Sequence, residues 1–81
     1  SMTTTALIID DEPDIRQLIA MTFSRMGLEH HSAANLEEAR QLLNTYDFDI
    51  CLTDMRLPDG NGVEFVRYVH SIKPNLPVAN S

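Results

Sequence analysis

Short apolar runs alternate with longer amphipathic segments along this chain. Residues 6–9 (Ala-Leu-Ile-Ile) and 50–53 (Ile-Cys-Leu-Thr) are continuous runs that end abruptly in acidic residues. Such runs are typical of strands that are buried on both faces of a parallel sheet. A more polar segment at about Glu29–Ala33 predicts a strand at a sheet edge, and residues 77–79 (Pro-Val-Ala) predict the start of a fourth strand.

Three segments between these runs carry apolar residues at helical spacing, and we expect their stripes to face a core. Pro13 is tolerated in the first turn of the first helix, and Gly27 is expected to end that helix. The other two helices each begin with a capping box, in which an Asn and a Glu satisfy free backbone N–H groups. The capping pairs are Asn35 with Glu38 and Asn61 with Glu64, and the stripes are Ile15, Leu18, Ile19, Thr22, Phe23 and Met26, then Leu36, Ala39, Leu42, Leu43 and Tyr46, then Phe65, Val66, Val69 and Ile72.

The predicted elements alternate between strand and helix from end to end. This order indicates an α/β domain with a doubly wound parallel sheet and right-handed crossovers. A chain of 81 residues holds one domain at most. We expect residues 1–5 to be a flexible N-terminal stretch in which Ser1 is a remnant of tag removal, and residues 6–81 to form the domain.

Composition excludes several classes of function. A formal net charge of −6 argues against direct nucleic-acid binding, which needs a basic surface. The chain has no apolar run near the roughly 18 residues of a membrane helix and no signal-peptide pattern. With a single cysteine, these features predict a cytoplasmic protein. We expect Cys51 to be a small core residue, and we expect surface or edge positions for His30, His31 and His70, which lack metal-ligand spacing.

Acidic residues follow two of the predicted central strands: Asp10 and Asp11 after the first run, and Asp54 after the run at 50–53. In an open parallel sheet, ligands bind beyond the carboxyl ends of the strands. If these strands are neighbours, three carboxylates meet in one shallow pocket, where they repel each other unless a cation neutralises them. Mg²⁺ prefers such oxygen ligands, and a carboxylate beside it can attack phosphorus to give an aspartyl phosphate.

Other interpretations of these acidic residues compete with a phosphoryl site. Residues 10–12 (Asp-Asp-Glu) could be a solvated cluster that interacts with a helix N-terminus. The position of Asp54, directly after a buried run and before the Pro-Asp-Gly turn at 58–60, favours a site. A calcium-binding loop fails on ligand spacing from either Asp54 or Asp59. A metal-dependent phosphatase would need an Asp-x-Asp pair after the first strand, and residues 10–12 do not supply it.

The two acidic segments resemble the hallmark segments of response-regulator receiver domains from two-component systems. The segments are residues 7–12 (Leu-Ile-Ile-Asp-Asp-Glu) and 50–62 (Ile-Cys-Leu-Thr-Asp-Met-Arg-Leu-Pro-Asp-Gly-Asn-Gly), and the resemblance covers the chain after its first few residues. It implies a flavodoxin-like receiver fold of strand order 2-1-3-4-5, represented here by three strand-helix units and the start of a fourth strand. Residues 55–62 look most like receivers of NtrC-type transcription activators, with pilin-gene regulators as one branch.

By this resemblance, Asp54 accepts a phosphoryl group from a sensor histidine kinase, and the domain controls an attached output domain that activates transcription. Receivers assist their own phosphoryl transfer but are not enzymes that act on an outside metabolite. The resemblance implies that Asp11 coordinates Mg²⁺ directly, Asp10 directly or through water, and that Asp54 and the backbone carbonyl of Arg56 complete the protein ligands. Arg56 and Asp59 either tune the choice of kinase or are solvated loop residues.

The family pattern continues past residue 81 with a switch Ser or Thr, a Lys and two more helices, so the resemblance implies a truncated receiver. Ser81 falls just short of the switch hydroxyl, and residues 80–81 (Asn-Ser) are unfavourable as strand interior. The missing last helix is expected to leave apolar surface uncovered at positions such as Ile8 and Ile50. We therefore expect self-association, and the alternative function is a phosphorylation-independent dimerisation or interaction module.

Overall fold

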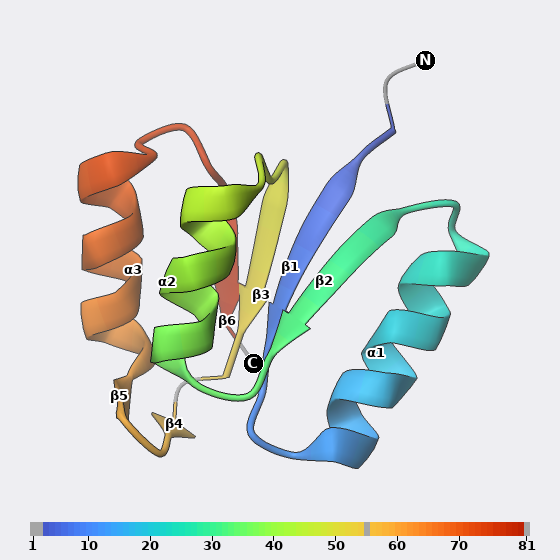
Figure 1. Ribbon diagram of the computed structural model, residues 1–81, viewed down its shortest axis with the longest axis horizontal. Helices are drawn as coiled ribbons and strands as arrows, with labels where there is room; N and C mark the ends of the chain where they lie inside the picture. The colour runs from blue at the N-terminus through green and yellow to red at the C-terminus, as the bar shows by residue number, and fades with distance from the viewer. Residues whose placement is uncertain (1–2, 55, 81) are drawn as a thin grey trace.

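The fold is a parallel sheet with helices on both faces. The computed structural model describes residues 3–54 and 56–80. Its four-stranded sheet has the order β2-β1-β3-β6, and every neighbouring pair is parallel. Figure 1 shows α1 on one face of the sheet and both α2 and α3 on the other. The strands are β1 (Thr5–Ile9), β2 (Glu29–Ala33), β3 (Ile50–Thr53) and β6 (Val78–Asn80), and the helices are α1 (Pro13–Arg25), α2 (Leu36–Thr45) and α3 (Gly62–Ile72).

This topology confirms the predicted α/β class and its doubly wound sheet. The chain moves from β1 to one neighbour through α1, and then returns past β1 to its other neighbour through α2. Because each parallel crossover is right-handed, reversing its direction places the next helix on the opposite face. The reversal occurs between β1 and β3, which is where ligands bind in open α/β sheets.

The helix boundaries follow the local signals in the sequence. Pro13 begins α1, and Gly27 follows its end with a φ of 78°. Asn35 caps α2, because its side chain accepts from the N–H of Glu38 at 2.8 Å, while the Glu38 carboxylate accepts from the N–H of Ala34 at 2.8 Å. Asn61 also caps α3, because its side chain accepts from the N–H of Glu64 at 2.9 Å, but no return bond from the Glu64 carboxylate is found among the described residues. A residue of suitable cap chemistry therefore starts each of α2 and α3 at the predicted place.

One element was absent from the sequence-based prediction. The turn at residues 58–60 is the tip of a small antiparallel hairpin, in which β4 (Arg56–Leu57) pairs with β5 (Gly60–Asn61). Strands of two residues carry no detectable period, so only the turn chemistry was visible. The hairpin matters here because it follows β3, after which Asp54 lies.

The larger part of the core lies between the sheet and the α2/α3 face. Leu7 and Ile9 of β1 pack there with Cys51 of β3 and with Phe65 and Val69 of α3. All five are at most 1% exposed. Burial raises the pKa of the Cys51 thiol to about 12, so the expectation of an inert core cysteine is supported.

The α1 face differs from the prediction in two ways. Its apolar stripe is largely exposed, with Leu18 at 61% and Met26 at 65%, since α1 alone lies on this face among the described helices. The expectation that Ile8 is uncovered is wrong: Ile8 is 0% exposed because β1 is an inner strand beneath α1. Ile50, by contrast, is half-buried.

Tyr46 is also misassigned by its helical spacing. It is 43% exposed instead of belonging to the core, because α2 ends at Thr45 and the chain turns away. Its ring stacks on His31 of β2, with centroids 4.0 Å apart. His31 is therefore a half-buried residue of the edge strand, as its polarity predicted.

Strand pairing extends close to both ends of the described chain. β1 begins at Thr5, one residue earlier than predicted, and the N–H of Thr5 donates to Asp49 Oδ2 at 2.9 Å. Asn80 belongs to β6 and pairs with Thr53, although asparagine is unfavourable in a strand interior. It is tolerated because it is exposed at the end of an edge strand, where its polar side chain meets solvent. Ser1 and Ser81, on which other expectations rest, lie outside the described residues.

Candidate functional site

The sheet brings the three predicted carboxylates together. β1 and β3 are neighbours, with Ile9 in register with Thr53, so the next residues on the two strands leave the sheet side by side. The N–H of Asp54 donates to the carbonyl of Ile9 at 2.9 Å, which extends the pairing to the edge of the site. Among the residues that the structure describes, Asp10, Asp11 and Asp54 each offer a ligand oxygen, and these oxygens all lie within 4.8 Å of one another.

Asp10 is the most firmly held of the three. It is 7% exposed, and its Oδ1 accepts from the N–H of Glu12 at 2.9 Å. Its own N–H donates to the carbonyl of Ala33 at 3.1 Å, while Arg16 Nη1 donates to its carbonyl oxygen at 2.8 Å. These bonds fix both the backbone and the side chain at the exit of β1.

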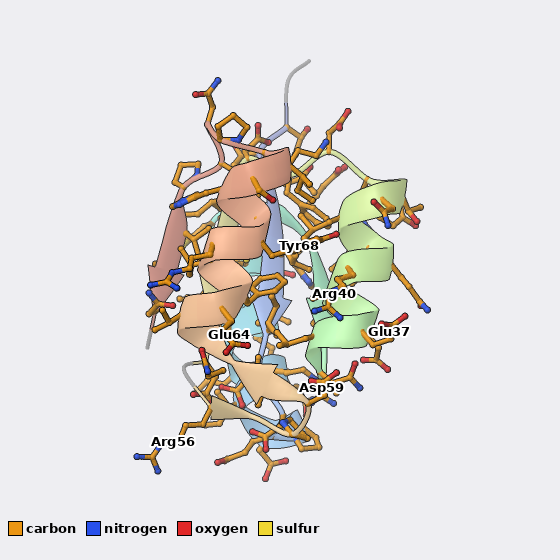
Figure 2. All side chains as sticks on the ribbon, turned by 90° about the vertical axis from the view of Figure 1, so that its left-hand side faces the viewer. Glu37, Arg40, Arg56, Asp59, Glu64 and Tyr68 are labelled. Carbon is orange, nitrogen blue, oxygen red and sulfur yellow. The ribbon has the colours of Figure 1, made fainter. Side chains whose placement is uncertain are left out.

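Asp54 is held from its own strand and from the hairpin that follows. The hydroxyl of Thr53, which is fully buried, donates to the carbonyl of Asp54 at 3.0 Å. The N–H of Arg56 donates to Asp54 Oδ1 at 3.1 Å. Asp54 is half-buried, which leaves it accessible to a reaction partner. The guanidinium of Arg56 points away from the body of the domain (Figure 2), so its backbone, and not its side chain, is the part of Arg56 near Asp54.

The donor set fits a hard divalent cation. Three carboxylates within 4.8 Å repel each other strongly unless a positive charge joins them. Carboxylate oxygens are the ligands that Mg²⁺ prefers, and Mg²⁺ uses few protein groups because it retains several waters. The chain's single lysine, Lys73, follows the end of α3 and pairs with Asp47 at 3.7 Å, so it is engaged elsewhere. The residues present therefore match the predicted Mg²⁺ set of Asp10, Asp11 and Asp54.

The structural roles of two residues near the site, Arg16 and Asp59, were not predicted from the sequence. Arg16 supports the backbone of Asp10 from the first turns of α1. Asp59 reaches α2, where its carboxylate accepts from two backbone N–H groups. The role of Asp59 has no local sequence signal, because its partners are 22 and 23 residues away. The bond from Arg16 spans six residues and follows no recognised capping motif.

With this geometry in place, the comparison with known families is unambiguous. The chain matches the response regulator receiver domain over residues 6–80, and it belongs to that family. A receiver is a signalling module of two-component systems and not an enzyme that acts on an outside substrate, as predicted from the resemblance. No helix among residues 3–54 and 56–80 is long and apolar enough to cross a membrane.

Curated proteins with similar sequences include regulatory proteins of bacteria. The chain is 57% identical over 74 residues to the response regulator protein PilR of Pseudomonas aeruginosa, covering 91% of this chain and 17% of that protein. It is 36% identical over 78 residues to the C4-dicarboxylate transport transcriptional regulatory protein DctD of the same species, covering 93% of this chain and 16% of that protein. The predicted likeness to NtrC-type regulators, with the pilin-gene branch among them, is confirmed.

Solved receiver domains have the same fold. A chemotaxis response regulator of Vibrio cholerae matches with a TM-score of 0.92 at 30% identity, over 98% of this chain and 68% of that one. The response regulator TrrA of Thermotoga maritima, solved in complex with Mg²⁺-BeF, matches with a TM-score of 0.89 at 28% identity, over 94% of this chain and 66% of that one. The chain thus spans about two-thirds of these two solved receivers and less than a fifth of PilR and DctD.

Proposed function

We propose that this chain is a phosphoacceptor module of a two-component system and that Asp54 accepts the phosphoryl group. The observation that carries the proposal is the convergence of Asp10, Asp11 and Asp54 at the carboxyl ends of β1 and β3, with their oxygens within 4.8 Å. In this proposal Asp10, Asp11, Asp54 and the backbone carbonyl of Arg56 hold Mg²⁺. When bound, Mg²⁺ offsets the negative charge of the carboxylates and of the phosphoryl oxygens.

The acceptor step uses one oxygen of Asp54 as the nucleophile. Its Oδ1 accepts from the N–H of Arg56, which orients the carboxylate and leaves Oδ2 for the attack. The new bond joins Oδ2 to phosphorus, the bond between phosphorus and the donor histidine breaks, and the imidazole leaves with the electron pair. Asp10 and Asp11 act as fixed charges that bind the cation and do not react themselves.

The partners in this proposal are a sensor histidine kinase and an output domain that controls transcription, in the cytoplasm. Membership of the receiver family and the likeness to PilR and DctD, whose names describe regulators, support these partners. The net charge of −6 supports the proposal that this domain does not itself bind nucleic acid.

A small phosphodonor tests the acceptor role without the kinase. We would incubate the chain with acetyl phosphate and measure its intact mass, with Mg²⁺ or with a chelator, for the wild type, Asp54→Asn and Asp47→Asn. Asp47 is a matched control because it is an exposed aspartate that pairs with Lys73. We expect a phosphoryl adduct on the wild type and on Asp47→Asn when Mg²⁺ is present, and no adduct in the chelator. An adduct of equal yield on Asp54→Asn, or none on the wild type, would contradict the proposal.

The second candidate function is a phosphorylation-independent interaction module. The observation that favours it is the exposed apolar stripe of α1, in which Ile15, Leu18 and Met26 are 37%, 61% and 65% exposed. Exposed apolar patches are typical of association surfaces. The acetyl phosphate experiment separates the two functions, since a module of this second kind forms no adduct.

A further inference from the structure

The hairpin that follows the acceptor strand is fastened to the N-terminus of α2. Asp59, in the turn between β4 and β5, accepts from the N–H of Leu36 through Oδ1 at 2.9 Å and from the N–H of Glu37 through Oδ2 at 3.1 Å. Both oxygens of one carboxylate thus bind successive N–H groups in the first turn of a helix 22 and 23 residues earlier in the chain. Figure 2 shows Asp59 beneath this end of α2.

These bonds complete a helix start that its own cap leaves unfinished. The first N–H groups of a helix have no partner within the helix. Asn35 satisfies the N–H of Glu38, and Asp59 satisfies those of Leu36 and Glu37. A negative charge at a helix N-terminus is also favourable. The N–H of Leu36, with a further contribution from that of Glu37 and from the charge of Arg40, lowers the pKa of Asp59.

Packing supports the same attachment independently of the carboxylate. A Cβ on Gly60 would lie 2.6 Å from Leu36 Cδ1, so the backbone of the turn rests directly on this buried leucine. Leu57, on the other strand of the hairpin, packs against the α2/α3 core. The hairpin is therefore held on α2 by its turn and on the core by one side chain.

The other end of the same hairpin reaches the acceptor. Arg56 begins β4, donates its N–H to Asp54 Oδ1 and pairs with Asn61. β4 has only two residues, so Arg56 is separated from Asp59 by Leu57 and Pro58 alone. A displacement of the turn away from α2 is transmitted to the Arg56 backbone, because so short a ladder cannot absorb it.

We propose that Asp59 is a positioning residue for the phosphoryl site: it ties the hairpin to α2 and thereby fixes the Arg56 backbone beside Asp54. The role rests on the proposed function, since it concerns the Arg56 carbonyl that is assigned to Mg²⁺. Asp59 touches neither the cation nor the phosphoryl group. The competing explanation is that Asp59 only stabilises α2.

Three variants separate these explanations. Asp59→Ala removes both bonds to α2, and Asp59→Asn retains one acceptor oxygen of the two. Asn35→Ala weakens the start of α2 without touching the hairpin, which makes it the matched control for helix stability. We would measure the amide resonances of Leu36 and Arg56 by NMR without Mg²⁺, the dissociation constant for Mg²⁺, and the rate of phosphorylation by acetyl phosphate.

We expect Asp59→Ala to shift the amide resonances of both Leu36 and Arg56, and to weaken Mg²⁺ binding about tenfold, the low end for residues that support a metal ligand. Asp59→Asn should fall between Asp59→Ala and the wild type. Asn35→Ala should leave the Arg56 amide resonance unshifted, because the hairpin contact remains. Its Mg²⁺ affinity should stay within about twofold of that of the wild type.

An unchanged Arg56 resonance in Asp59→Ala would overturn the proposal, as would an equal loss of Mg²⁺ affinity in Asn35→Ala. If the wild type binds no Mg²⁺, the proposed function fails, and the NMR comparison alone then decides whether Asp59 positions the Arg56 backbone.

Discussion

Three carboxylates that share a site without a cation should destabilise the domain, and Asp11→Asn should relieve part of this repulsion. The ligand oxygens lie within 4.8 Å, and at that separation two unit charges repel by about 3.5 kcal/mol at an effective dielectric constant of about 20 and by about 0.9 kcal/mol in water. Asp11 is exposed, so solvent and salt place the value toward the lower limit. Because Asp11 faces both Asp10 and Asp54, we expect its neutralisation to stabilise the chain by about 1–2 kcal/mol without a divalent cation.

Mg²⁺ should reverse this difference. A ligand that binds only the folded state stabilises it by about 2.7 kcal/mol at one hundred times its dissociation constant. The wild type gains this stabilisation, whereas Asp11→Asn loses a charged ligand and gains less. In a chelator we therefore expect the variant to be the more stable protein, and at saturating Mg²⁺ we expect the wild type to be the more stable one.

Urea unfolding followed by circular dichroism measures both differences. Asp47→Asn is the control, since it removes the same charge from a fully exposed side chain that pairs with Lys73 and should change stability little in either buffer. If Asp11→Asn is less stable than the wild type in the chelator, or if Mg²⁺ stabilises both proteins equally, the electrostatic account of the site is refuted.

Three further predictions follow from burial and contacts elsewhere in the domain. Cys51, whose pKa burial raises to about 12, should react with a thiol reagent at neutral pH only after the chain is unfolded; rapid labelling of the native chain would contradict its core position. Self-association should involve the α1 stripe, so multi-angle light scattering should give a mass above the monomer for the wild type and a smaller mass for Leu18→Glu, whereas a concentration-independent monomer would exclude it. Asp59 has a lowered pKa in the folded state, so its contribution to stability is complete above the ordinary aspartate pKa and is lost as the pH falls through the folded pKa. Glu37 and Arg40 face it from α2. The free energy of unfolding in urea should therefore fall less steeply with decreasing pH for Asp59→Asn than for the wild type, and identical slopes would contradict this.

The elements that the sequence predicted well are those with a local cause. The buried runs at 6–9 and 50–53 became inner strands, and Asn35 and Asn61 started helices where their side chains could cap them. The acidic residues were placed correctly for the same reason. Once β1 and β3 are neighbours, the residues that follow them must meet at one edge of the sheet.

The features that were missed depend on contacts between distant segments. Tyr46 has the spacing of a core residue, yet its exposure is decided by where α2 ends and by the ring of His31 on another element. Ile8 is fully buried in β1, which α1 contacts, and this burial could not be judged without the packing of that helix. The bonds from Asp59 to α2 join residues 22 and 23 positions apart, which is farther than the roughly 11–18 residues over which helix and strand patterns are recognised.

Mapping the modified residue decides whether Asp54 is the phosphoryl acceptor of a site built with Asp10 and Asp11. The chain would be treated with acetyl phosphate and Mg²⁺, reduced with borohydride to convert an acyl phosphate into homoserine, digested and analysed by tandem mass spectrometry. We expect homoserine at position 54, and only when Mg²⁺ was present. Homoserine at position 10 or 11, or equal labelling in the chelator, would contradict it.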